Sequence, residues 1–220
     1  MTGYLLLFTG ILSALSRHSH SLSCIQCTHF EGDSCTGPAQ TCPKPDQICR
    51  SMYMLTTVGG VSKHPSFIRA CGDRATCHLS GSLSSPNDRT QSSSTCCNSD
   101  GCTPEKPVLL PISNEKNNVT CQSCRSDTKG SCQSSDYIQC EGEEVKCFKQ
   151  SQTIKGNKGT KKSSMRGCAT KTICNVSHVE ESMTDMTVIT DFTCSDRCTG
   201  LHYSLSPLLL TIGLIIKVLH

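Results

Sequence analysis

Cysteine is the residue type in this chain whose number and spacing could do chemistry. The chain holds 19 cysteines among 220 residues and no tryptophan. Two Cys-x2-Cys pairs, Cys24 with Cys27 and Cys121 with Cys124, have the spacing at which thiolates bind zinc. Each pair lies in its own cysteine-rich stretch, which favours cross-linking in an oxidising compartment over a metal site. We therefore expect disulfides and no cofactor.

Catalytic constellations are the next candidates. Five histidines between the N-terminal segment and the last residue occur singly and recur at no equivalent place in the two halves: His29, His64, His78, His178 and His202. No G-x-S-x-G nucleophile motif is present. The sequence indicates that the protein is not an enzyme, and the histidines are expected in solvent-facing loops.

One segment carries an unbalanced charge that could bind a partner. Five of its cations lie close together within a stretch, residues 149–179, that holds no acid: Lys155, Lys158, Lys161, Lys162 and Arg166. Such a segment could attract an acidic protein, anionic lipid head groups or glycans. The alternative is a solvated loop kept soluble by its lysines. The net charge of +3 for the whole chain gives no support for nucleic-acid binding.

The elements that must position these residues come from an internal repeat. Between successive cysteines from Cys24 to Cys77 there are 2, 7, 6, 6, 21 and 5 residues. From Cys121 to Cys174 the numbers are 2, 7, 7, 6, 20 and 5. This agreement indicates a duplication. It predicts two domains, residues 22–103 and 121–199, joined by a Pro-containing extended linker over residues 104–120.

Both ends of the chain resemble processing signals. An apolar run from Tyr4 to Leu15 precedes small residues, so we expect a signal peptide over residues 1–21. Residues 200–220 end in a short apolar tail, which predicts a glycosylphosphatidylinositol (GPI) attachment signal with Cys198 or Gly200 as the attachment site. The alternative is an apolar end that packs against the second domain.

The Cys-x2-Cys starts of both repeats and the CCNSDGCT motif at residues 96–103 resemble the lymphocyte-antigen-6/urokinase-receptor family. The resemblance implies an all-β, disulfide-rich fold of two tandem three-finger domains. It also implies pairings, namely Cys24–Cys49, Cys27–Cys35, Cys42–Cys71, Cys77–Cys96 and Cys97–Cys102, and in the second repeat Cys121–Cys147, Cys124–Cys132 and Cys140–Cys168.

The end of the second repeat departs from this pattern because one cysteine is missing. By spacing, Cys194 matches Cys97 and would pair with Cys198, which leaves Cys174 as a free thiol. The alternative pairs Cys174 with Cys194 and frees Cys198. We favour the first arrangement.

Residue patterns inside the repeats predict the fingers. Residues 51–58 and 66–70 should form a hairpin around Gly59-Gly60, and residues 148–154 and 163–167 a second hairpin. Residues 187–193 read as a strand. The same pattern predicts a third finger between Cys77 and Cys96, whose serine-rich loop is expected to be mobile and little involved in packing.

A two-domain chain of this kind also resembles the gamma-type phospholipase A2 inhibitors. The function that we expect is a GPI-anchored cell-surface protein that binds a protein ligand (a receptor, a protease or a secreted phospholipase A2) through its fingers. The alternative is a soluble secreted inhibitor of phospholipase A2. Two sequons, at Asn118 and Asn175, predict N-glycosylation.

Overall fold

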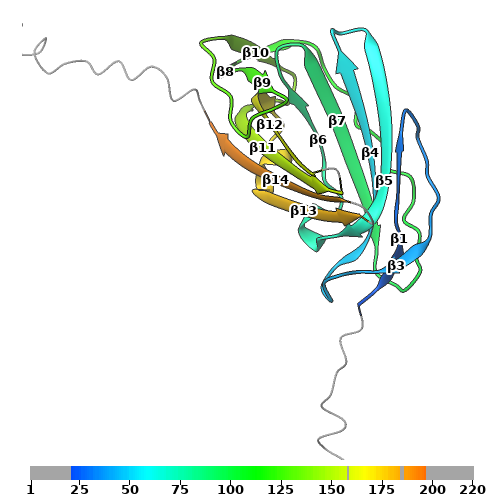
Figure 1. The fold of residues 1–220 in the computed structure, drawn as a ribbon. Helices are drawn as coiled ribbons and strands as arrows, with labels where there is room; N and C mark the ends of the chain where they lie inside the picture. Colours follow the sequence, from blue (N-terminus) through cyan, green and yellow to red (C-terminus); the bar gives the residue numbers. More distant parts are fainter. Residues whose placement is uncertain (1–20, 158, 184–185, 197–220) are drawn as a thin grey trace, which may run out of the picture.

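The computed structural model describes residues 21–157, 159–183 and 186–196 (Figure 1). The expected signal peptide, except its last residue, lies outside this part of the chain, as do Lys158, Cys198 and the expected GPI signal. Among the described residues, no helix has the length and apolar character needed to cross a bilayer.

The first repeat is built from seven strands and one helical turn. They are β1 (Ser23–Ile25), β2 (Cys27–Phe30), β3 (Ala39–Thr41), β4 (Ile48–Val58), β5 (Ser62–Gly72), η1 (Arg74–Thr76), β6 (Ser80–Ser84) and β7 (Asp88–Cys97). The expected first hairpin falls within β4 and β5. Gly59 and Gly60 make its turn at φ values of 60° and 75°, which glycine adopts without strain.

The second repeat mirrors the first. Its elements are β8 (Lys116–Gln122), β9 (Cys124–Ser126), β10 (Tyr137–Glu141), β11 (Lys146–Gly156), β12 (Gly159–Ala169), η2 (Ile173–Asn175), β13 (His178–Met183) and β14 (Met186–Ser195). The expected hairpin and strand fall within β11, β12 and β14. The all-β, disulfide-rich fold expected from the sequence is thus confirmed.

Disulfides form the centre of each repeat. The first repeat has Cys24–Cys49, Cys27–Cys35, Cys42–Cys71, Cys77–Cys96 and Cys97–Cys102, and the second has Cys121–Cys147, Cys124–Cys132, Cys140–Cys168 and Cys174–Cys194. In each repeat, two of these bonds pack together into a buried cluster. All except the last are the pairs that the family resemblance implies.

The pairing expected for Cys174 and Cys194 was wrong. These two cysteines bond to each other, with Cα atoms 5.7 Å apart, so Cys174 is not a free thiol and Cys194 is not available to Cys198. The physical reason lies in the position of the partners. Cys174 is in η2 and Cys194 is near the end of β14, and this bond ties the base of the third finger as Cys77–Cys96 does in the first repeat.

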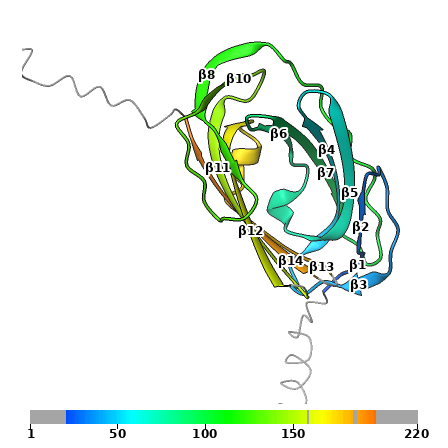
Figure 2. The same cartoon turned by 45° about the horizontal axis from the view of Figure 1, so that its top comes forward.

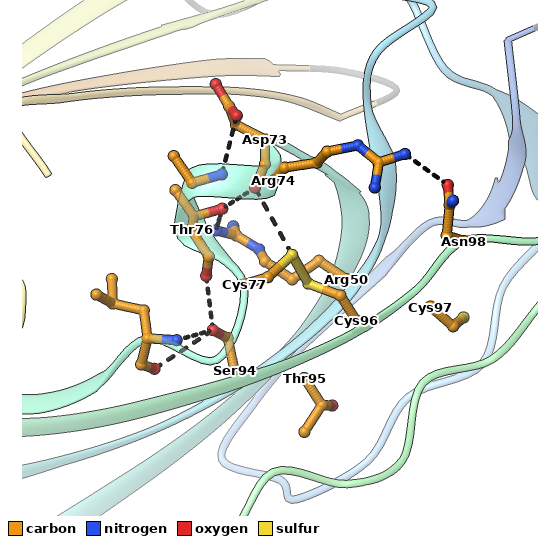
Figure 3. Close-up of a disulfide and its surroundings, with 12 residues drawn as sticks. Arg50, Asp73, Arg74, Thr76, Cys77, Ser94, Thr95, Cys96, Cys97 and Asn98 are labelled. Carbon is orange, nitrogen blue, oxygen red and sulfur yellow. Dashed lines mark hydrogen bonds between the residues drawn. A yellow bond between two sulfur atoms is a disulfide. The ribbon is translucent and has the colours of Figure 1, made fainter.

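The third finger expected between Cys77 and Cys96 is present as β6 and β7, but the expectation that its serine-rich residues take little part in packing was wrong. Both strands lie inside the sheet, and Ser93 and Ser94 are buried. The Ser94 hydroxyl donates to the Thr76 carbonyl at 2.8 Å beside the Cys77–Cys96 bond (Figure 3). Small hydroxyl side chains let neighbouring strands approach while their own polar groups are hydrogen-bonded.

The segment expected as a linker packs along the first domain. Pro107 is fully buried, and the carbonyls of Pro104 and Leu110 accept hydrogen bonds from Ser51 and Gln91. These contacts place the segment across one face of the β4–β7 sheet. Strand β8 begins at Lys116, inside the expected linker, so the second repeat starts earlier than its first cysteine.

The two repeats share one sheet. Its order is β13-β14-β11-β12-β6-β7-β4-β5-β2, and the junction is the antiparallel pairing of β12 with β6 at Cys168↔Ser84 and Ala169↔Leu83. The repeats lie head to tail, so that the finger ends of each approach the base of the other (Figure 2). β13, at one end of the sheet, lies against β5 of the first repeat.

Buried charges hold this arrangement. Arg50, 4% exposed, donates to Glu181 of the other repeat and, at 2.8 Å, to Thr76. Burial lowers the pKa of Arg50 to about 10. At the other end of the interface, Glu144 is 1% exposed and pairs with Arg89 at 3.1 Å. A buried ion that lost its partner would be strongly destabilising, so these pairs fix how the repeats sit.

Candidate functional site

The basic segment expected from the sequence lies on the central finger of the second repeat. Lys155 is near the end of β11, and Lys161 and Lys162 are near the start of β12; all three are exposed. In the hairpin register Ile154 is opposite Lys161 and Thr153 is opposite Lys162. Because adjacent residues of a strand point to opposite faces, Lys161 and Lys162 project from the two sides of the finger.

These three lysines form a group that we call the lysine tip: Lys155, Lys161 and Lys162. Lys155 and Lys162 share one face, since Thr153, two residues from Lys155, is the register partner of Lys162. In the described part of the chain none of the three takes part in an ion pair. The tip therefore presents positive charge in more than one direction without internal compensation.

The other two predicted cations, Lys158 and Arg166, are not part of the lysine tip. Lys158 lies outside the described residues. Arg166 is half-buried and donates to the Gln122 side chain at 2.6 Å, so its guanidinium is part of the packing between β12 and β8. Arg166 is therefore removed from the candidate surface.

Three acids of the neighbouring third finger are described, and each has a partner other than the lysine tip; Asp185 lies outside the described residues. Glu181 is buried against Arg50, and Glu180 accepts from Lys44 of the first repeat at 3.2 Å. Asp191 lies 2.7 Å from His178. Two of these three carboxylates are thus engaged with the first repeat, so among the described residues the positive charge of the lysine tip can attract an acidic partner.

Of the predicted histidines, His202 lies outside the described residues, and the two that pair with a carboxylate are in different repeats. His64 contacts Glu31 at 3.0 Å in the first repeat, and His178 contacts Asp191 in the second; both histidines are exposed. The cysteine groups that are close enough to hold a metal ion all consist of residues engaged in the disulfides above, so these thiols offer no thiolate ligand.

The two predicted glycosylation residues both reach solvent. Asn118 is exposed on β8, and Asn175 is exposed at the end of η2. Neither side chain would need to leave the protein interior to carry a sugar.

The domain interface and the hollow beside it were missed by sequence reasoning. Arg50 and Glu181 are separated by 131 residues, and no local pattern marks either as buried. Next to the Arg89–Glu144 pair, a cavity of about 1040 Å³ opens between the finger ends of the first repeat and β10. A sequence signal there is the apolar character of the linker end.

Comparison with known proteins agrees with the duplicated fold. A model of the u-PAR/Ly-6 domain matches residues 20–105 and again residues 117–200. The chain belongs to this family. The family resemblance, and the two tandem three-finger domains that it implies, are thereby confirmed.

Receptors and inhibitors are among the relatives of this u-PAR/Ly-6 chain. The urokinase plasminogen activator surface receptor of Mus musculus is 28% identical over 166 residues, 73% of this chain and 49% of the receptor. A gamma-type phospholipase A2 inhibitor of Laticauda semifasciata is 28% identical over 162 residues, 70% of this chain and 85% of the inhibitor. The phospholipase A2 inhibitor NAI of Notechis ater is 27% identical over 178 residues, 78% of this chain and 85% of the inhibitor.

These lengths matter for the comparison. The chain spans about half the length of the urokinase receptors that it matches, but most of the length of the inhibitors. The relatives support a protein-binding role for the family; they do not separate a surface receptor from a secreted inhibitor.

Proposed function

We propose that this protein is a non-enzymatic binding protein of the cell surface, held by a GPI anchor, that recognises an acidic protein ligand through the lysine tip. The observation that carries the proposal is the set of exposed lysines Lys155, Lys161 and Lys162, which form no ion pair among the described residues and lie beside a finger whose described acids have other partners. Long-range attraction from such a group raises the rate of encounter with an acidic partner and favours one docking orientation.

The anchor is tested by surface release. The full chain is expressed in animal cells, and intact cells are stained before and after treatment with phosphatidylinositol-specific phospholipase C. Loss of the surface signal, with recovery of the protein in the medium, supports the anchor. Protein found in the medium without enzyme treatment would refute it.

Ligand recognition is tested with two charge-reversal variants of equal net charge. Lys155→Glu with Lys161→Glu alters the lysine tip, and Lys149→Glu with Lys171→Glu alters exposed lysines away from it. Multimers of the wild type and of each variant are screened against a panel of extracellular proteins. We expect acidic proteins among the binders, and loss of their binding in the tip variant only. Equal binding by both variants would contradict a role for the tip.

A second candidate function is inhibition of secreted phospholipase A2, favoured by the match to 85% of the length of two such inhibitors. It is tested with purified protein in a phospholipid hydrolysis assay. Inhibition at near-equimolar protein, together with spontaneous release into the medium, would support this candidate over the anchored one.

A further inference from the structure

The cavity beside the domain interface is lined by both repeats. From the first repeat it is bounded by the ends of the β4–β5 and β6–β7 hairpins, and from the second by the linker end and β10. Figure 2 shows β8 and β10 across from the ends of β4 and β5. Its volume of about 1040 Å³ exceeds what one side chain fills. The hollow is a product of the head-to-tail arrangement, since neither repeat alone encloses it.

One wall of the cavity is the edge of a strand. Tyr137, Ile138 and Gln139 follow one another in β10, and all three line the cavity. Successive side chains of a strand point to opposite faces, so a hollow that touches three in a row must border the edge of the strand. Within the described residues, β10 is paired with β8 alone. Its other edge therefore offers backbone donors and acceptors to the cavity.

Exposed apolar side chains gather around this cavity and the smaller hollow beside it. Eight large apolar residues of the described chain are exposed, and four of them line this cavity or the smaller hollow of about 330 Å³ next to it: Leu110, Ile112, Tyr137 and Val145. Ile112, 41% exposed, lines both hollows and joins them. A concentration of exposed apolar surface around a groove marks an interaction site.

The charged residues that line the cavity favour neither a strongly acidic nor a strongly basic ligand. The lining holds three cations and three anions: Lys63, Arg89, Lys116, Asp88, Glu141 and Glu144. Arg89 is already shared by the Glu141 and Glu144 carboxylates, at 3.2 and 3.1 Å. A polyanion or a polycation would therefore gain little. What the cavity offers is backbone pairing along one edge and apolar contacts along its rim.

We infer that this cavity binds an extended, predominantly uncharged segment of a partner protein, which adds as a third strand to the β8–β10 sheet. Only a polypeptide backbone supplies alternating donors and acceptors at the spacing of a strand edge. Alternate side chains of the added segment would contact Tyr137 and Ile112 on the rim. The inference goes beyond the lysine tip and does not depend on it.

The test begins with a display library of linear ten-residue peptides, selected on the full chain purified from animal cells. Recovered peptides are measured by fluorescence anisotropy. Tyr137→Ala should weaken binding at least tenfold, whereas Phe30→Ala, which truncates another exposed aromatic outside the cavity, should leave it unchanged. The tip variant with Lys155→Glu and Lys161→Glu should also bind as wild type, so this test and that of the lysine tip can fail separately.

Two readouts distinguish strand addition from simple apolar contact. Bound peptide should slow amide hydrogen exchange in Tyr137–Gln139 but not in β2, the edge strand at the far end of the large sheet. N-methylation of one alternating set of peptide residues should abolish binding, and methylation of the other set should not. Failure to recover any peptide, insensitivity to Tyr137→Ala, or a dimer of the chain that Tyr137→Ala dissociates would each overturn the inference.

Discussion

At the scale of single residues, the interface between the repeats depends on charges that are out of contact with water. Arg50 and Glu181 are almost fully buried and come from different repeats. Taking two charges out of water is unfavourable, and only their mutual attraction, with the added hydrogen bond to Thr76, offsets it. The pair is therefore a weak source of net stability but a strong determinant of how the repeats dock.

Removing one residue of the Arg50–Glu181 pair should cost far more stability than replacing both residues. Arg50→Met should lower the free energy of unfolding by about 3–5 kcal/mol, because Glu181 would remain buried without a counter-charge. The double variant Arg50→Met with Glu181→Leu should recover much of the loss. Denaturant unfolding with the disulfides intact measures both. A double variant as unstable as the single one would contradict this account.

The surface ion pair of Lys106 with Asp33 ties the linker to the first repeat, and its effect should be measurable as the pKa of Asp33. Lys106 donates to Asp33 at 2.5 Å, and this hydrogen bond and charge hold the pKa of Asp33 below its ordinary value. A lowered carboxyl pKa contributes stability above the unfolded pKa of 3.8, and that contribution is lost as pH falls through the folded value. Lys106→Ala should raise the Asp33 pKa towards its ordinary value, as followed by NMR. An unchanged pKa would show that the linker does not dock there in solution.

At the scale of elements, the seam between β12 and β6 allows no extra side-chain atom. A Cβ on Gly167 would lie 1.8 Å from the Ser84 carbonyl oxygen, whereas a Cβ on Gly130 would meet only the end of the Lys162 side chain at 3.7 Å. The glycine at 167 is thus required by the close approach of two backbones that belong to different repeats.

Alanine substitutions at Gly167 and Gly130 should affect stability differently, because only Gly167 lies in the close contact between β12 and β6. Gly167→Ala should destabilise the protein by about 1–3 kcal/mol, since the seam must widen to accept the methyl group. Gly130→Ala should change stability by far less. Thermal unfolding measures the difference, and equal effects at both positions would show that the seam can relax.

The Cys174–Cys194 disulfide at the base of the last finger can be tested by disulfide mapping of the purified protein. Non-reducing peptide analysis should recover a Cys174–Cys194 peptide. Replacing both of these cysteines with alanine should lower stability by about 2–4 kcal/mol, typical of a native cross-link. Recovery of a Cys194–Cys198 peptide instead would restore the pairing expected from spacing.

Sequence patterns predicted the elements whose residues favour strands locally. Residues 51–58 hold β-branched and aromatic side chains before Gly59-Gly60, and they became β4. The packing of the serine-rich β7 inside the sheet was missed because it depends on the neighbouring strands β4 and β6, not on the residues of β7 itself. The lysine tip was visible as a run of charge, but Arg166 was misplaced because its contact with Gln122 links distant segments.

At the scale of the whole molecule, the repeats form one structural unit. They share a sheet, a buried ion pair at each end of the interface and a linker that packs along one repeat. Two domains joined only by a flexible linker would unfold independently, but here the loss of either repeat would leave buried charges of the other without partners.

Calorimetry should therefore show a single cooperative unfolding transition for the wild type. A variant that combines Arg50→Met and Arg89→Met, which removes the cations from both ends of the interface, should separate into two transitions. Two transitions in the wild type would show that the repeats are independent in solution.

The head-to-tail contact has a consequence for how such a protein can change over generations. In an isolated module, finger ends are the parts that tolerate insertions and acquire new partners. Here the finger ends of the first repeat, through Asp88 and Arg89, are bound to Arg125 and Glu144 of the second. A new loop on one repeat must therefore suit the base of the other, so the unit that can be exchanged, grafted or recombined without damage is the pair of repeats.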